Sequence, residues 1–196
     1  MREDDTLRLH RAIDGISEAS FEELLLEAGD RGELHQRYAN QFAMSRGDAG
    51  GRWFDKSPQN VYGLLLINAL FPGAQIVHIH RHPLNVIASL ATGEVMPQHS
   101  LTAGINAWGE AIAIVQEYKV GWPSRIHEIA YEDLVTNPAV ALRELLGFLG
   151  EDWSDAMIEG IVVHPERNKY TETLSAEDCD TVRSVLADQM KLYNYI

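Results

Sequence analysis

The stretch from residue 75 to residue 89 constrains the fold more than any other part of this sequence. Gln75 to His80 is a short run rich in β-branched residues and of strand length, and Arg-His-Pro follows it directly. Pro83 suits the first turn of a helix, where its missing N–H costs nothing. Arg81 is therefore expected at the carboxyl edge of a strand, which is where open α/β sheets bind their ligands.

A helix is predicted upstream of this strand, and a serine follows on the helix after it. Ser57-Pro58 is typical of a helix start, and Pro72-Gly73 ends that helix. Ser89 lies about two helical turns after Arg81, too far for direct contact. A phosphate could bridge the two side chains, because a guanidinium offers a bidentate fork and a hydroxyl offers one donor.

The rest of the chain predicts alternating helices and short strands. Residues 5–47 predict two or three amphipathic helices, one of them started by a Ser20/Glu23 capping box. Because the strands are short, apolar and separated by helices, we expect a parallel sheet. The expected strands are Ile76–His80, Ile126–Ala130 and an additional Trp53–Asp55, and further helices are expected over residues 100–118, 138–149 and 154–161 and from Ser175 onward.

The composition indicates a globular domain with an acidic surface. A chain of 196 residues, 45% of them hydrophobic, can bury a core. The formal charge of -13 argues against nucleic acid or an anionic membrane as a partner. Cys179 is the only cysteine, which excludes an internal disulfide and suits a reducing compartment. We expect a cytoplasmic protein, because the sequence shows no signal peptide and no apolar run long enough to span a bilayer.

Four motifs, in this order, resemble those of the sulfotransferases that use 3′-phosphoadenosine-5′-phosphosulfate (PAPS), and among them the tyrosylprotein-sulfotransferase-like branch. They are Asp55-Lys56-Ser57-Pro58, then Arg81-His82-Pro83 with Ser89 eight residues after the arginine, then Tyr-Glu-Asp-Leu-Val-Thr-Asn-Pro at residues 131–138, and finally Phe148-Leu149-Gly150 followed by Trp153-Ser154-Asp155. The resemblance covers about residues 50–196.

This resemblance implies a fold and an activity. The fold would be a P-loop-NTPase-like three-layer α/β sandwich with a parallel sheet, in one domain over residues 1–196 with a helical segment 1–50 and a core 51–196. The activity would be sulfuryl transfer from PAPS to a hydroxyl or amine of a small-molecule or peptide acceptor, without a metal. Lys56 would be the catalytic residue. PAPS, or its product PAP, would be bound by Arg81, Ser89, Tyr131 and Lys169.

One part of the family pattern is not found. The family begins with a strand and an Arg/Lys-Ser-Gly-Thr-Thr loop, whose backbone amides cradle the 5′-phosphosulfate. Residues 44–51 are Gly-rich but lead into no helix start or Thr pair. We expect the missing strand, loop and helix, together with the catalytic base, upstream of Met1. The 196-residue chain is then expected to transfer sulfate weakly or not at all.

Other functions stay open at this stage. The chain could be a non-catalytic module that binds PAP or a protein partner. It could also be a remnant of a P-loop-related kinase, although no acidic Mg²⁺ ligand follows a strand in the expected way. The acceptor, the identity of the base and the oligomeric state are not readable from the sequence.

The singled-out residues also have structural interpretations. Arg81 could pair with a carboxylate at the strand end, and Tyr131 could be a packed core aromatic. Ser89 could bond to its own preceding helical turn, and Lys56 could be a solvated residue before a helix. The alternating histidines could place two rings on one face and bind a metal, although packed or hydrogen-bonded histidines are the commoner outcome; they are His78, His80 and His82.

Overall fold

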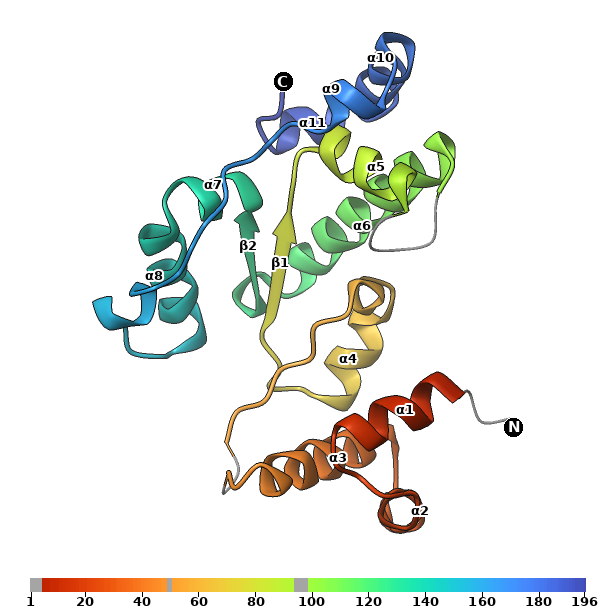
Figure 1. Ribbon diagram of the computed structural model, residues 1–196, viewed down its shortest axis with the longest axis vertical. Helices are drawn as coiled ribbons and strands as arrows, with labels where there is room; N and C mark the ends of the chain where they lie inside the picture. Colours follow the sequence, from red (N-terminus) through yellow and green to blue (C-terminus); the bar gives the residue numbers. More distant parts are fainter. Residues whose placement is uncertain (1–4, 49–50, 94–98) are drawn as a thin grey trace. The chain divides into compact units, whose positions relative to one another are not determined.

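The computed structural model describes residues 5–48, 51–93 and 99–196, and these form two compact units (Figure 1). Unit 1 comprises Met1–Gly73 and unit 2 comprises Ala74–Ile196. The single domain expected from the sequence, with its internal boundary at residue 50, stays a prediction.

The regular elements among the described residues of unit 1 are all helical. Its elements are α1 (Asp5–Ile13), α2 (Glu18–Glu27), α3 (Arg31–Ser45), the 3-10 turn η1 (Pro58–Gly63) and α4 (Leu64–Leu70). The three helices before residue 46 confirm the expectation for that segment. The capping box expected at Ser20 and Glu23 is wrong. Ser17 already caps α2, because its Oγ accepts the N–H of Ser20 at 3.1 Å and the helix begins earlier.

Residues 53–55 do not form the expected strand. The indole N–H of Trp53 donates to Oε1 of Gln36 at 3.2 Å, and its ring meets that of Phe71 edge-on, with centroids 5.7 Å apart. These side-chain contacts fix the segment within unit 1, whereas a strand requires a neighbouring backbone to pair with. Of the Gly-rich stretch 44–51, residues 49 and 50 lie outside the described residues.

Unit 2 contains two strands and the helices around them. Its elements are β1 (Ile76–His80), α5 (Pro83–Thr92), α6 (Leu101–Gly121), the 3-10 turn η2 (Pro123–Arg125), β2 (Ile126–Ala130), α7 (Tyr131–Thr136), α8 (Pro138–Leu149), the 3-10 turn η3 (Asp155–Ile158), α9 (Tyr170–Thr173), α10 (Ala176–Val185) and α11 (Ala187–Leu192). β1 and β2 pair in parallel, with Ile76 opposite Ile126, which confirms the prediction that these two segments belong to a parallel sheet. Within the described residues the second edge of β1 has no strand beside it.

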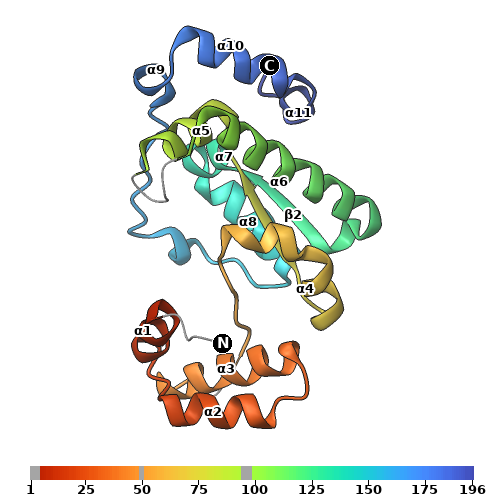
Figure 2. The same cartoon turned by 90° about the vertical axis from the view of Figure 1, so that its right-hand side faces the viewer.

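Helices lie on both faces of this small sheet. The ring of His127 stacks on that of Phe148 in α8, with centroids 5.3 Å apart, whereas the next residue, Glu128, bonds to Lys119 of α6 at 2.6 Å. Because successive strand residues point to opposite faces, α8 covers one face of β2 and α6 covers the other. Figures 1 and 2 show β1 and β2 between these two helices.

The main core of unit 2 is formed by α5, α6, α10 and α11. The helix expected over residues 100–118 is present as α6, and Ser100 caps it by accepting the N–H of Ala103. Gly104 lets α5 approach closely, because an added Cβ would lie 3.3 Å from Cγ2 of Ile87. The buried cluster consists of Leu84, Ile87, Ile105, Trp108, Ile112, Cys179, Val182, Leu186 and Met190.

The segment between α8 and α9 is less regular than expected. The helix predicted over residues 154–161 is only the short turn η3, after which Gly160 turns the chain at φ 79°. Residues 161–168 then run without helix or strand past α7 toward α9 (Figure 1). None of the helices formed by the described residues combines the length and apolar character needed to cross a bilayer.

Candidate functional site

The backbone of Arg81, directly after β1, is fixed by two neighbouring elements. Its carbonyl accepts the indole N–H of Trp108 from α6 at 3.0 Å. The N–H of the next residue, His82, donates to Oε1 of Glu132 in α7 at 2.8 Å. The His82 ring in turn caps α5, because its Nδ1 accepts the N–H of Leu84. The strand end therefore has a well-defined position from which the Arg81 side chain projects.

The Arg81 guanidinium is engaged by a carboxylate and an aromatic ring. Its Nε and Nη2 each donate to one oxygen of Glu166, both at 2.6 Å. Its Cζ lies 4.8 Å from the centroid of the Tyr131 ring, a cation–π geometry. The sequence interpretation in which Arg81 pairs with a carboxylate at the strand end is thus what the structure contains.

The pKa values of both partners are shifted in the direction that favours the charged form. Hydrogen bonding to Glu166 raises the pKa of Arg81, against burial, which lowers it. Burial alone would raise the pKa of Glu166, but the bonds from Arg81 and from the backbone of Asn168 outweigh it and lower that pKa below its ordinary value. Both groups are therefore charged near neutral pH.

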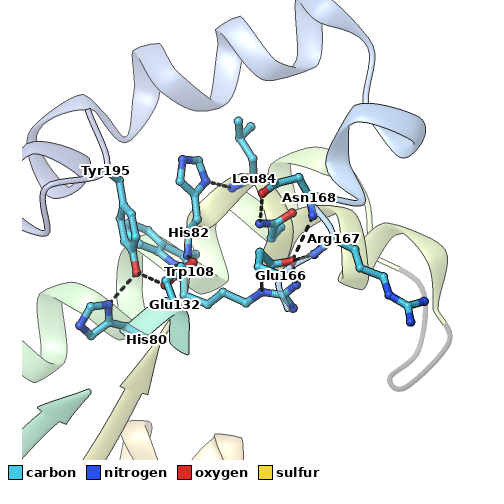
Figure 3. A network of polar contacts seen from close by, with 11 residues as sticks. His80, His82, Leu84, Trp108, Glu132, Glu166, Arg167, Asn168 and Tyr195 are labelled. Atoms are coloured by element: carbon cyan, nitrogen blue, oxygen red, sulfur yellow. Dashed lines mark hydrogen bonds and ion pairs between the residues drawn. The ribbon is translucent and has the colours of Figure 1, made fainter. Parts of the chain in front are cut away.

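Glu166 also binds the backbone that follows it. Its Oε1 accepts the N–H of Arg167 at 2.8 Å and that of Asn168 at 3.2 Å, so both oxygens of this carboxylate are occupied (Figure 3). Asn168 adopts a left-handed conformation with φ 49°. Its Oδ1 accepts a hydrogen bond from Nδ2 of Asn85, a residue that is 2% exposed. Within the described residues, Oδ1 of Asn85 is buried without a partner.

The other predicted binding residues surround this cluster to different degrees. Tyr131 begins α7 and contacts Arg81. Ser89 is exposed on α5, and in the described part of the chain no hydrogen bond joins its hydroxyl to Arg81. Lys169 is exposed immediately before α9. Lys56 is exposed in unit 1, whereas the other four lie in unit 2, so its role beside them stays a prediction.

A groove of about 330 Å³ extends from Tyr131. It is lined by apolar side chains of α7, α8 and the irregular segment, namely Leu134, Val135, Pro138, Leu142, Ile161, Val162 and Val163, together with His164. The ring that lies beneath the Arg81 guanidinium therefore also borders an apolar groove, so a charged group and a flat apolar group could bind next to each other.

The C-terminal residues cover the carboxyl end of the sheet. The Tyr195 hydroxyl lies 2.8 Å from Nδ1 of His80 and donates to Oε2 of Glu132 at 3.3 Å. The Tyr193 hydroxyl donates to Oε2 of Glu128. Burial and the bonds to these carboxylates raise the pKa of both tyrosines. The sequence offered one signal for this network, the alternation of polar residues along β1, but nothing that identified its partners.

The histidines considered as metal ligands have other contacts. Nδ1 of His78 lies 3.3 Å from Oε2 of Glu128, and the rings of His80 and His82 contact the C-terminal tyrosine Tyr195. Within residues 5–48, 51–93 and 99–196, no three or more His, Cys, Asp or Glu side chains are grouped so that they could bind a metal ion.

Comparison with known proteins identifies the family. The profile of the Sulfotransferase family matches residues 2–155, and the chain belongs to this family. Its fold is similar to that of the "Sulfotransferase Domain from the Curacin Biosynthetic Pathway", with a TM-score of 0.51 and 19% identity over 78% of this chain and 67% of that one. This likeness concerns the fold alone.

A relative at the sequence level comes from Aquifex aeolicus (strain VF5). It is an "Uncharacterized protein"; the match is 29% identical over 116 residues and covers 55% of this chain. The matched region spans 15% of the length of that relative. The sulfotransferase family predicted from the four motifs is thus confirmed, whereas the roles of individual residues stay predictions.

Proposed function

We propose that this protein transfers a sulfuryl group from PAPS to a hydroxyl or amine acceptor. The observation that carries the proposal is the position of Arg81, a guanidinium at the carboxyl end of a parallel strand with its backbone fixed by Trp108 and Glu132. Ligands of α/β proteins bind at this end of the strands. The family assignment supports the reaction type, sulfuryl transfer. The resemblance of the four motifs to those of PAPS-dependent sulfotransferases supports PAPS as the donor.

The donor set around Arg81 suits an anion with several oxygens. Four N–H groups converge on the Glu166 carboxylate, two from the guanidinium and two from the backbone of Arg167 and Asn168. A carboxylate and a phosphate are recognised by the same guanidinium fork and the same kind of backbone donors. The residues present therefore fit the 3′-phosphate of the donor nucleotide.

In this proposal, each of the five predicted site residues has its own role in binding or catalysis. When bound, PAPS supplies the sulfuryl group, and PAP remains after transfer. Arg81 and Ser89 bind the 3′-phosphate, and Tyr131 and Lys169 flank it. Lys56 stabilises negative charge that develops on the oxygen linking the sulfuryl group to the nucleotide, which is the electrostatic contribution that a mobile ammonium can make.

The finer fold is part of the same proposal. We propose a P-loop-NTPase-like three-layer sandwich that forms one domain. Its support is the parallel β1–β2 pair with α6 and α8 on opposite faces, together with the likeness to a solved sulfotransferase domain.

A cytoplasmic location is proposed because the single cysteine, Cys179, is a buried free thiol, which suits a reducing compartment.

A second candidate is a non-catalytic module that binds PAP or a protein partner. One observation favours it: the Arg81 guanidinium is already neutralised by the Glu166 carboxylate. In this case the nucleotide or partner would bind at Arg81 without transfer of the sulfuryl group.

A transfer assay distinguishes the two candidates. Radiolabelled PAPS is incubated with the 196-residue protein and with p-nitrophenol or a tyrosine-containing peptide as acceptor, and labelled product is counted. The expected signal is weak, and Lys56→Ala lowers it by about a hundredfold or more. Lys191→Ala, which changes an exposed lysine of α11, is the matched control and leaves it unchanged. If the protein binds the nucleotide but transfers no label, the result supports the non-catalytic module. If the protein neither binds the nucleotide nor transfers label, both candidates are contradicted.

A further inference from the structure

The Glu166 carboxylate occupies the donor groups of the candidate site in the way that a bound anion would. Each of its oxygens accepts from the Arg81 guanidinium at 2.6 Å, and Oε1 accepts two further backbone N–H groups. The side chain is 14% exposed, compared with 28% for that of Arg81, so the carboxylate is the less exposed member of the pair. An exposed ion pair contributes little, but a bidentate pair of this burial is specific in its geometry.

The carboxylate comes from a segment without regular structure. Residues 161–168 form neither helix nor strand, and Glu166 lies 85 positions after Arg81 in the sequence. The bond from Asn85 to Asn168 ties the end of this segment to α5. This bond holds the Asn168 side chain against α5 without involving the Glu166 carboxylate, so the segment has an anchor next to the two backbone donors that the carboxylate accepts.

We propose that Glu166 is an internal competitor that occupies the anion-binding position of Arg81, so that a ligand phosphate binds only by displacing it. The inference rests on the proposed function, because it takes Arg81 as the residue that binds the 3′-phosphate. Glu166 then determines which anions the site accepts. It is a specificity-determining residue that acts by competition.

The physical reason is the effective concentration of a tethered group. A carboxylate attached to the same chain competes at an effective concentration in the millimolar range or above, and no translational entropy is lost when it binds. A free monoanion that offers only the same two hydrogen bonds cannot displace it. A nucleotide with a dianionic 3′-phosphate brings more charge and further contacts, such as those available in the groove beside Tyr131.

Calorimetry with adenosine 3′,5′-bisphosphate tests this inference directly. The proteins compared are the wild type, Glu166→Gln, Glu166→Ala and Arg81→Ala, each checked for folding by circular dichroism. Removing the competing charge should tighten bisphosphate binding by about tenfold or more in both Glu166 variants, equivalent to about 1.4 kcal/mol. The affinity for adenosine 5′-monophosphate, which lacks the 3′-phosphate, should stay the same. Glu172→Gln, an exposed carboxylate in α9, removes the same charge as a control and should leave both affinities unchanged.

The outcomes separate the inference from the proposed function. If Arg81→Ala weakens binding while both Glu166 variants bind like the wild type or more weakly, Glu166 supports the site and the inference is overturned alone. If Glu172→Gln tightens binding as much as Glu166→Gln, the effect is a general change of charge, and the inference also fails. If Arg81→Ala binds like the wild type, or if no variant binds the bisphosphate, the proposed role of Arg81 fails and the inference fails with it.

Discussion

The indole N–H of Trp108 donates to the backbone carbonyl of Arg81 across 3.0 Å. Trp108 is 6% exposed and belongs to the core cluster of unit 2, whereas Arg81 carries the guanidinium of the candidate site. The position of the strand end is therefore set from the core. A change in the core at this point should alter ligand binding as well as stability.

Replacing Trp108 with Phe tests this connection. The substitution keeps an aromatic ring in the core but removes the donor, which leaves the Arg81 carbonyl without this bond. A loss of about 1–3 kcal/mol in the free energy of unfolding is expected, together with a smaller loss of affinity for the bisphosphate. Urea unfolding and calorimetry measure the two effects. Trp122→Phe, which changes a ring packed on Tyr118 outside the site, should leave the affinity unchanged.

Tyr195 should stabilise the strand end through its hydroxyl. Replacing it with Phe removes the bonds to His80 and to Glu132 and leaves the ring packing in place. A decrease of about 1 kcal/mol in the free energy of unfolding is expected for each hydrogen bond lost. Equal urea midpoints for the wild type and Tyr195→Phe would show that these bonds contribute nothing.

Acid should destabilise unit 2 in two stages. Burial, assisted by the nearby charge of His78, lowers the pKa of His80 below 6.5, so the unfolded chain binds this proton more readily than the folded one. The free energy of unfolding should therefore fall as the pH drops below about 6.5 toward the lower folded pKa.

The second stage involves Glu128. Burial raises its pKa, but hydrogen bonds from His78, Lys119 and Tyr193 outweigh burial and lower it well below 4.5. The stability contributed by this carboxylate is complete above about pH 4.5 and is lost as the pH falls further. Urea unfolding over a pH series measures both stages. His80→Gln should reduce the slope near pH 6, and a flat profile from about pH 8 to pH 5 would contradict the first stage.

Ser89 should contribute to nucleotide binding without contributing to the fold. Its hydroxyl is exposed on α5, so Ser89→Ala should leave the urea midpoint unchanged. If the hydroxyl donates to the 3′-phosphate, its loss should weaken bisphosphate binding by about tenfold or more, the value of a hydrogen bond to a charged group. Thr92→Ala, one turn further along α5, is the matched control. An unchanged affinity in Ser89→Ala would remove this residue from the site.

Local sequence signals predicted most elements of unit 2. Pro138 and Gly150 delimit α8 as expected, because proline fits the first helical turn and Gly150 adopts φ 75° just after the last. The two parallel strands were predicted by their apolar runs and flanking turns. The predicted Trp53–Asp55 strand failed because a strand depends on a partner, and the sequence of a segment does not specify its partner.

The candidate site was predictable only in part, for the same reason. The place of Arg81 at a strand end follows from the residues beside it. Its partner Glu166 lies 85 positions away, in a segment with no periodicity, and the contact between His80 and Tyr195 spans 115 positions. Such long-range pairs arise from tertiary packing, so no local pattern could predict them.

The central claim is that Arg81 binds the 3′-phosphate of the donor nucleotide, and one calorimetric comparison tests it most directly. Adenosine 3′,5′-bisphosphate and adenosine 5′-monophosphate are titrated into the wild type, Arg81→Ala and Arg143→Ala. Arg143 is the matched control, an exposed arginine that also pairs with a carboxylate, Asp155, and lies over an aromatic ring, Trp153. The account predicts that the wild type and Arg143→Ala bind the bisphosphate about tenfold or more tightly than the monophosphate, and that Arg81→Ala abolishes this difference. Equal affinity of the wild type for the two nucleotides, or an undiminished difference in Arg81→Ala, would contradict it.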